Sequence, residues 1–294
     1  MPRALSATFL NGNYRKFFDI PYYDASADQR MDVWLPPEGE GPFPTVIFFH
    51  GGAFRHGEKR EDQSEPALRL LNLGFAVADV EYRKSREASF PAMLYDAKAA
   101  VRFLRANAEK YSLDPARFAA FGPSAGGWIV SMLGLTAGNP ALEDLTMGNA
   151  GYSSAVQAVV DWCGPCGDFG KMDGDFAAGT VRNADGHSQV DSMESLFLGA
   201  AVCGVPELCR LASPYIYADK KTPPFLILHG DRDETVPIGQ SYRLCEAIRA
   251  AAGEDRVEMH VLTDTPHHSR VWNDDRRIAA YTENFLLKIL GDKR

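Results

Sequence analysis

An apolar run at residues 117–121 leads directly into Gly-Pro-Ser-Ala-Gly-Gly and then into a second apolar run that begins at Trp128. Gly122 and Gly126 flank Ser124 in the pattern G-x-S-x-G. Between a strand and a helix this pattern predicts a sharp bend with the serine hydroxyl exposed at its tip, because side chains at the glycine positions would collide with the adjoining strand and helix. Such a bend needs a helix packed on a sheet and therefore favours an α/β fold.

Short apolar runs alternate with amphipathic stretches along most of the chain. Apolar residues recur at helical spacing in residues 92–111 and 240–251. Several of the apolar runs have no polar face, which indicates strands covered on both sides. The alternation predicts a three-layer α/β fold with a mostly parallel central sheet and helices on both faces. The predicted strands are residues 15–23, 29–36, 44–50, 75–82, 116–122, 155–162, 223–230 and 256–262.

One stretch interrupts this alternation. Residues 164–214 are rich in Gly, Asp and Cys and have weak periodicity, which predicts an irregular, cap-like insertion after the sixth strand that contributes to substrate choice. A length of 294 residues is within the range of one large α/β domain. We therefore expect a single domain over residues 1–294.

Charge and composition restrict the partners and the compartment. A formal charge of −8, with basic residues scattered among acids, argues against a nucleic-acid partner. No run reaches the ~18 apolar residues that span a bilayer, and the first residues lack the apolar region of a signal peptide. With five cysteines, an odd number, we expect free thiols in a cytoplasmic protein without a membrane partner. The oligomeric state is not indicated by the sequence.

A glycine-rich loop follows the predicted strand at residues 44–50. It reads His50-Gly51-Gly52-Ala53-Phe54 and precedes Ser124 by some seventy residues. Backbone N–H groups of Gly52 and Ala53, with that of Ala125, are positioned by such loops to bind an oxyanion. We expect His50 to hold the loop by a hydrogen bond and His56 to lie on the surface.

A nucleophilic serine needs a base, and the base needs an orienting acid. Asp231, Asp233 and Glu234 follow the strand that ends at Gly230, and any of them is a candidate acid. His267 and His268 lie together in the loop after the last predicted strand and are the candidate bases, whereas His260 lies within that strand and is expected to pack structurally.

The quoted motifs together resemble those of α/β-hydrolases of the esterase/lipase group, near the bifunctional carbohydrate acetyl esterase/feruloyl esterase (BD-FAE-like) branch. The resemblance extends from about Phe17 to the C-terminal helix and includes HGGAF, VEYR, LDPARFAAFGPSAGG, SSAVQAVVDWCGP, ASPYIY and PPFLILHGDRDETVP. It implies a triad of Ser124, Asp233 and His267, in the chain order serine, acid, histidine. His268 takes a position that is usually held by a small residue, and Asp231 is then expected to cap the loop.

Residues 162–166 read Trp-Cys-Gly-Pro-Cys, the letters of a thioredoxin motif. That chemistry needs the first thiol at a helix N-terminus, whereas the resemblance places Cys163 and Cys166 at a strand end. A disulfide between them that forms on oxidation remains a hypothesis, as does a pairing of Cys203 with Cys209. Residues 171–176 resemble part of a calcium loop but lack its remaining ligands, so we expect neither a metal nor a cofactor.

The resulting hypothesis is a serine carboxylic-ester hydrolase that acts on short-chain acyl esters. The resemblance implies acetyl or feruloyl esters of carbohydrates or small alcohols as substrates. An exopeptidase or arylformamidase on the same fold is an alternative, because H-G-x-x-D-x-x-V-P also occurs in prolyl-oligopeptidase-like enzymes. A catalytically silent binding protein is a third hypothesis, and it would require the loss of a triad residue.

Overall fold

The strands form one eight-stranded sheet. The computed structural model describes residues 3–179, 181–182 and 186–291. The sheet order is β1-β2-β4-β3-β5-β6-β7-β8; β2 runs antiparallel to its neighbours β1 and β4, and the other pairs are parallel. All eight predicted strands are confirmed. Their bounds are β1 (Arg15–Pro21), β2 (Arg30–Leu35), β3 (Phe43–Phe49), β4 (Ala76–Val80), β5 (Leu113–Pro123), β6 (Ala158–Trp162), β7 (Phe225–Gly230) and β8 (Val257–Leu262).

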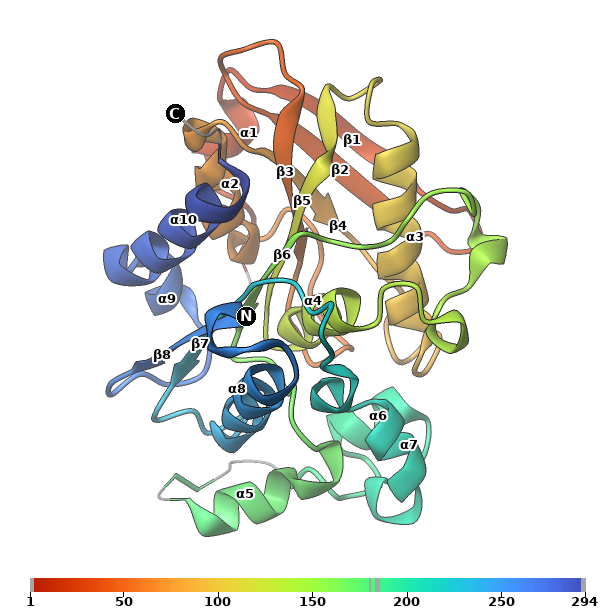
Figure 1. The fold of residues 1–294 in the computed structure, drawn as a ribbon, viewed down its shortest axis with the longest axis vertical. Coiled ribbons are helices and arrows are strands. Elements are labelled where there is room, and N and C mark those ends of the chain that lie inside the picture. The colour runs from red at the N-terminus through yellow and green to blue at the C-terminus, as the bar shows by residue number, and fades with distance from the viewer. Residues whose placement is uncertain (1–2, 180, 183–185, 292–294) are drawn as a thin grey trace.

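Helices flank the sheet, with α3 and α10 on opposite sides of it in Figure 1. The helix predicted at residues 92–111 is present but ends at Ala106, because Asn107 leaves the helical conformation and its Nδ2 donates a 2.9 Å hydrogen bond to the carbonyl of Phe103. The helices are α1 (Ala7–Asn11), α2 (Glu65–Leu68), α3 (Ala92–Ala106), α4 (Ala125–Leu135), α5 (Met172–Ala178), α6 (Met193–Leu198), α7 (Pro206–Leu211), α8 (Gly239–Ala252), α9 (Arg270–Asp274) and α10 (Arg276–Leu290).

The sheet separates two hydrophobic cores. Along β3, Ile47 and Phe49 pack into the core that includes α3, α4 and α8, whereas Val46 and Phe48 pack into the core that includes α2, α9 and α10. Successive side chains of a strand point to opposite faces, so one apolar strand supplies both cores. This explains why the strands appear in the sequence as continuous apolar runs. The single sheet shared by both cores supports our proposal that the chain is one domain.

The insertion predicted after the sixth strand lies between β6 and β7. Its described residues carry three short α-helices, α5, α6 and α7. Its Phe197 is fully buried and stacks on Phe54 of the glycine-rich loop, with the ring centroids 4.1 Å apart. The calcium-like sequence at residues 171–176 lies largely in α5, where Asp175 is ion-paired with Arg243.

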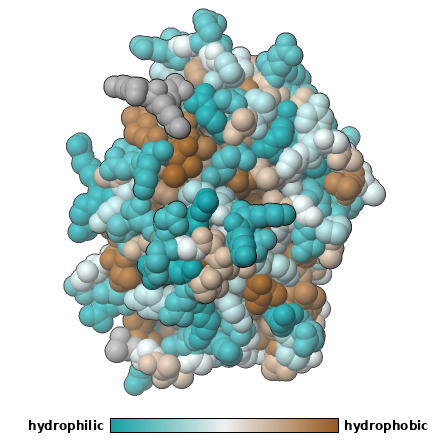
Figure 2. Space-filling view, viewed as in Figure 1, coloured by the Kyte–Doolittle hydropathy of each residue, from teal (hydrophilic) through white to brown (hydrophobic). Residues whose placement is uncertain are grey.

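In the described part of the chain, no helix is long and apolar enough to cross a membrane. The face of the molecule in Figure 2 is mostly hydrophilic, and its hydrophobic patches are small and separate.

Candidate active site

Ser124 occupies a strained bend between β5 and α4. Its φ is 55° and its ψ is −120°, an uncommon conformation for a residue with a side chain. A Cβ atom at Gly126 would lie 2.0 Å from the carbonyl oxygen of Phe49, and one at Gly122 would lie 2.6 Å from that oxygen. Both glycines are therefore required by the close approach of β3 and α4. The bend is held by a 2.7 Å hydrogen bond from the N–H of Ser124 to the carbonyl of Trp162.

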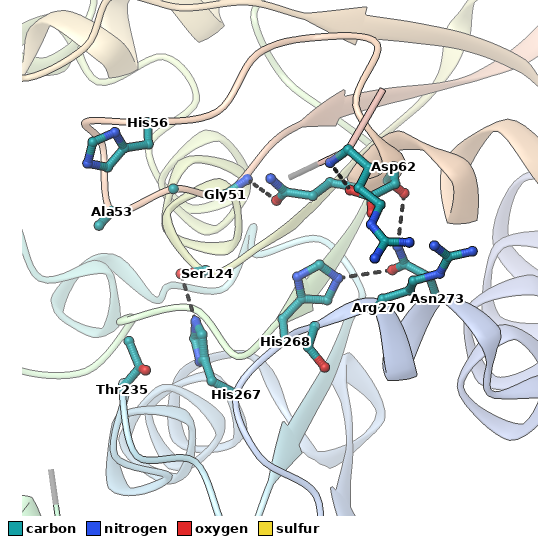
Figure 3. A pocket seen from close by; sticks show the side chains of 14 residues that line it. Gly51, Ala53, His56, Asp62, Ser124, Thr235, His267, His268, Arg270 and Asn273 are labelled. Atoms are coloured by element: carbon teal, nitrogen blue, oxygen red, sulfur yellow. Dashed lines mark hydrogen bonds between the residues drawn. The ribbon is translucent and has the colours of Figure 1, made fainter. Parts of the chain in front are cut away.

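The structure brings Ser124, Asp233 and His267 together after the carboxyl ends of β5, β7 and β8, on one edge of the sheet. The Oγ of Ser124 lies 3.0 Å from Nε2 of His267, and Nδ1 of His267 lies 2.6 Å from Oδ2 of Asp233. Figure 3 shows the bond between Ser124 and His267 at the edge of the cavity. Since the Asp233 carboxylate can only accept, Nδ1 carries the proton and Nε2 is free to accept the serine proton. This geometry suits a general base acting on a serine nucleophile.

Asp233 is held in its ionised form by several donors. Its Oδ1 accepts hydrogen bonds from the N–H groups of Thr235 and Val236, at 2.9 and 2.7 Å. Burial alone would raise the pKa of Asp233, but the adjacent His267 and His229 outweigh burial and hold this pKa well below its usual range. The carboxylate therefore remains negative and can stabilise a positive charge that develops on His267.

Asp231 does not take part in this arrangement. Among the described residues its Oδ1 is buried without a hydrogen-bond partner, so the expected loop cap by its side chain is absent. The backbone of Asp231 instead donates to the carbonyl of Leu262 and joins the loops that follow β7 and β8. Of the candidate acids, Asp233 alone contacts a candidate base in the described structure.

His229 is a positioning residue that the sequence reasoning missed. It is fully buried at the end of β7, and its Nε2 lies 3.0 Å from the carbonyl of Val236 and 3.2 Å from Oδ2 of Asp233. Its Nδ1 is 2.7 Å from the hydroxyl of Ser241. His229 thereby ties the acid loop to α8. The signal available in the sequence was a histidine at the last position but one of an otherwise apolar strand.

His268 makes different contacts from its neighbour. Its Nε2 donates to Oδ1 of Asn273 at 3.1 Å, and its ring lies 5.8 Å from the ring of Trp162. In Figure 3 this bond directs the imidazole toward Asn273, whereas His267 is bonded to Ser124. The geometry thus separates the two candidate bases. Burial lowers the pKa of His268 to about 4, against the opposing effect of its hydrogen bond to Asn273.

The depressed pKa of His268 predicts a loss of stability in acid. The pKa of His268 is about 4 in the folded protein and 6.5 for an ordinary histidine. Folding is therefore favoured by the neutral imidazole above pH 6.5, and this stability is lost as the pH falls toward 4. We expect the free energy of unfolding to fall between pH 7 and pH 5 by about 1–2 kcal/mol more in the wild type than in His268→Gln. Urea unfolding of both proteins at the two pH values measures this difference. An equal fall in both would contradict the assignment of a neutral, packed imidazole.

The glycine-rich loop after β3 lies beside Ser124 in an unusual backbone conformation. Gly52, Ala53 and Phe54 have φ values of 119°, 52° and 59°. A Cβ at Gly52 would lie 2.2 Å from the carbonyl oxygen of His56, so only glycine fits there. Within the described structure, no hydrogen bond uses the N–H of Gly52 or Ala53. These donors, with the N–H of Ala125 at the start of α4, are the candidates for an oxyanion site.

Buried side chains fix this loop from behind. His50 contacts the carbonyl of Gly51 through Nδ1 at 2.6 Å and Oε1 of Glu81 through Nε2 at 3.0 Å, which confirms its expected role in holding the loop. The hydroxyl of Tyr82 donates to the carbonyl of His50 at 2.9 Å. Burial tends to raise the pKa of Glu81, but His50 and Lys84 outweigh it and lower this pKa to about 2. The loop is thus held by a charged, buried network.

His56 and His260 lie where the sequence predicts. His56 is exposed, although it also reaches the rim of the cavity at Ser124. His260 is half-buried on β8, where its ring stacks on Tyr281 with the centroids 3.8 Å apart. Neither residue contacts Ser124, Asp233 or His267 in the described structure.

A cavity of about 570 Å³ opens over Ser124. Its described lining contains no Phe, Tyr or Trp and no residue of the insertion at 164–214. The described part of the insertion contacts elements behind the cavity, such as Phe54 of the glycine-rich loop through Phe197. Arg3 and Arg270 are in the lining, and no motif in the sequence predicts a role for either of them. The lining residues are Arg3, Gly51, Gly52, Ala53, His56, Asp62, Gln63, Ser124, Thr235, His267, His268, Ser269, Arg270 and Asn273 (Figure 3).

The cysteines do not form a redox site in this structure. All five are free thiols, so neither proposed disulfide is present. Burial raises the pKa of Cys163 and of Cys166 well above the usual value, the opposite of what a thioredoxin thiol requires. No helix begins at Cys163, which directly follows β6 and has a φ of 46°.

Cys163 also lies close to the acid and the base. Ligand atoms of Cys163, Asp233 and His267 are within 4.8 Å of one another, the spacing of a metal site. Two of these groups already bond to each other, since Nδ1 of His267 lies 2.6 Å from Oδ2 of Asp233, and His267 also contacts Ser124.

The sheet order, the strained serine bend and the loops that meet beside it define an α/β-hydrolase. The BD-FAE family model matches residues 31–248, and the chain belongs to that family.

Two curated relatives come from Mycobacterium tuberculosis (strain ATCC 25618 / H37Rv). Esterase LipQ is 28% identical over 98% of this chain and 66% of its own length. Esterase LipC is 31% identical over 78% of this chain and 54% of its own length. The chain thus spans just under two thirds of the length of LipQ and about half of the length of LipC.

The fold is also similar to solved structures. A truncated form of a carbohydrate esterase from gut microbiota has a TM-score of 0.82 and 25% identity, covering 99% of this chain and all of that one. A bifunctional GH43-CE protein from Bacteroides eggerthii has a TM-score of 0.81 and 29% identity over 94% of this chain and 35% of that one.

Proposed function

We propose that this protein is a serine carboxylic-ester hydrolase with Ser124 as nucleophile, His267 as general base and Asp233 as orienting acid. The observation that carries the proposal is the continuous hydrogen-bonded relay from Ser124 to Asp233 at the edge of an open cavity. The esterase relatives and the carbohydrate esterase of similar fold support the same reaction class.

The proposed reaction proceeds in two halves. His267 takes the proton of Ser124 as Oγ forms a bond to the ester carbonyl carbon, and the carbonyl oxygen becomes an oxyanion near the N–H groups of Gly52, Ala53 and Ala125. The bond to the alcohol oxygen then breaks, and His267 returns its proton to that oxygen. Water attacks the acyl-enzyme by the same route and releases the acid and the free serine.

Short acyl groups fit the cavity better than aromatic ones. A feruloyl ring is planar and apolar, and protein sites usually bind such rings against hydrophobic or aromatic side chains. The described lining beside the loop at Gly52 contains no Phe, Tyr or Trp on which such a ring could stack. We therefore favour acetyl over feruloyl esters, with carbohydrates or small alcohols as the alcohol half.

A matched panel of substrates tests this proposal. We expect the wild type to hydrolyse 4-nitrophenyl acetate at least tenfold faster, by kcat/KM, than 4-nitrophenyl octanoate or a feruloyl ester, because the described lining has no Phe, Tyr or Trp against which a long or aromatic acyl group could pack. It should leave 4-nitroacetanilide almost untouched. Faster cleavage of the anilide would favour the alternative amide hydrolase, and preferred cleavage of the feruloyl ester would overturn the acyl assignment. Failure to cleave any member would favour the binding-protein hypothesis.

We also propose a cytoplasmic location. Five free thiols, four of them buried, suit a reducing compartment, since closely spaced cysteines in oxidising compartments are usually paired. Fractionation of the host cells, followed by detection of the protein, tests the location directly.

A further inference from the structure

One wall of the cavity beside Ser124 carries positive charge that the proposed hydrolysis does not use. Arg3 and Arg270 both line it, and Asp62 is the one acidic side chain in the described lining. The wall is therefore positive overall, although the whole chain has a formal charge of −8. A concentration of positive charge on an acidic protein, at the mouth of a reactive cavity, favours a ligand of negative charge.

Arg3 is held in place despite its position near the chain terminus. The N–H of Asp62 donates to the carbonyl of Arg3 at 2.8 Å, and the N–H of Leu5 donates to the carbonyl of Arg60 at 2.9 Å. Ala4 and Glu61 form an antiparallel bridge between these bonds, and the side chain of Leu5 is buried. The N-terminal segment is thus fixed to the segment that follows the glycine-rich loop, which brings Arg3 to the cavity.

The guanidinium groups of both arginines are available to a ligand. In the described part of the chain Arg3 makes no ion pair. Arg270 has one within its own short helix, 3.6 Å from Nε to Oδ2 of Asp274. The side chains of Arg270 and Asp274 are 58% and 62% exposed, so solvent screens this pair and it competes weakly with a ligand. A guanidinium presents a planar fork of donors that matches carboxylate and phosphate oxygens.

The position of this wall indicates which half of the ester it contacts. In Figure 3, Ala53 and His56 lie at one end of the cavity and Asp62, Arg270 and Asn273 at the other. The carbonyl oxygen must face the loop of Ala53, while the departing alcohol oxygen must lie at Nε2 of His267 to receive its proton. The alcohol half is therefore on the side of the loop that runs from His267 to Arg270.

We infer that Arg3 and Arg270 bind an anionic oxygen group, a carboxylate or a phosphate, on the alcohol half of the substrate. This inference rests on the proposed function and narrows its substrate class to short-chain acyl esters of acidic alcohols, such as acetylated sugar acids or acetylated sugar phosphates. The two arginines are then specificity-determining residues, and the triad is common to neutral and anionic substrates.

Matched sugars test the inference. The substrates are a mono-O-acetylated methyl glucoside, its glucuronate counterpart and its 6-phosphate counterpart, with acetate release as the readout. We expect the wild type to prefer one of the anionic esters to the neutral one by tenfold or more in kcat/KM, and the larger preference identifies carboxylate or phosphate as the group bound. Arg3→Gln and Arg270→Gln should each reduce this preference by about threefold to tenfold, and added salt should weaken it in the wild type.

Arg249→Gln is the control variant, because Arg249 is an exposed arginine of α8, paired with Glu254 and absent from the cavity lining. Its preference should match that of the wild type. Equal kcat/KM for the neutral and anionic sugars, or a preference that survives both cavity substitutions, would overturn the inference. Preferential cleavage of 4-nitrophenyl hemisuccinate over the butyrate, lost in Arg270→Gln, would overturn the assignment to the alcohol half.

Hydrolysis of 4-nitrophenyl acetate distinguishes failure of the anion-binding inference from failure of the proposed esterase function. If the wild type cleaves this neutral ester but shows no anionic preference, the inference fails and the proposed esterase stands. If it cleaves neither this ester nor the sugars, the proposed function itself fails. Thermal melting of each variant distinguishes a lost contact from a lost fold.

Discussion

Ser124→Ala is expected to lower kcat for 4-nitrophenyl acetate by about 10⁴-fold to 10⁶-fold, with little change in thermal stability. The substitution removes the oxygen that forms the acyl-enzyme, while backbone N–H donors and binding still supply a residual acceleration over water. The backbone should tolerate alanine, because Ser124 donates its own N–H to Trp162 and no hydrogen bond other than that to His267 is found for its hydroxyl among the described residues. Initial rates with enough enzyme to measure the residual activity test the prediction.

Ser131→Ala is the matched control for this experiment. Ser131 lies on α4, two turns after Ser124, and its hydroxyl donates to Oδ2 of Asp161 at 3.2 Å without contacting the cavity. We expect its kcat to stay within about threefold of the wild type, with a loss of stability of about 1 kcal/mol for the hydrogen bond. Loss of activity in Ser131→Ala, or retention of activity in Ser124→Ala, would mean that another group is the nucleophile.

The sequence predicts the parts of this site that depend on local backbone geometry. The bend at Ser124 and the loop at Gly52 each need glycine at fixed positions, and such requirements appear in one short stretch of sequence. The strands are predictable for a related reason. A strand of the central sheet supplies apolar side chains to two cores, so its hydrophobicity is continuous over five to seven residues.

The parts that sequence reasoning missed depend on distant segments that meet in space. Arg3 reaches the cavity because its segment bridges to Glu61, and nothing local to residues 3–5 indicates that pairing. His229 contacts Asp233 only because the loop after β7 folds back over the strand end. The local sequence alone did not distinguish Asp231 from Asp233, since both acids follow the strand within four residues, and only the resemblance to esterases indicated Asp233.

The insertion at residues 164–214 illustrates a different limit. Its helices are only six or seven residues long, too short for helical periodicity to be recognised against its glycines and acids. Their stability comes from tertiary contacts such as that of Phe197 with Trp128, with ring centroids 4.9 Å apart. The absence of helical periodicity therefore indicated where the insertion lies, but it could not predict the structure of the insertion.

The second large effect is expected on substitution of His267 and not on substitution of the adjacent His268. His267→Ala is expected to lower kcat for 4-nitrophenyl acetate by about 10⁴-fold, because no other group within reach of Ser124 in the described structure can accept its proton. His268→Gln is expected to lose less than tenfold, since its ring is bonded to Asn273 and does not contact Ser124.

The two substitutions can be distinguished further by rescue. Removal of the His267 imidazole leaves a space beside Ser124 that opens into the cavity, so added imidazole should restore part of the activity of His267→Ala and none of that lost in His268→Gln.

The reverse result, with the larger loss and the rescue at residue 268, would require the loop after β8 to turn by one position. That turn would take residue 267 away from Asp233 and break the 2.6 Å hydrogen bond. It would also move Trp272, whose side chain is fully buried and whose Nε1 donates to the carbonyl of Pro266 at 3.1 Å. A buried tryptophan with a satisfied donor resists such a shift, and so the packing behind the loop, more than the histidine itself, determines which imidazole faces the serine.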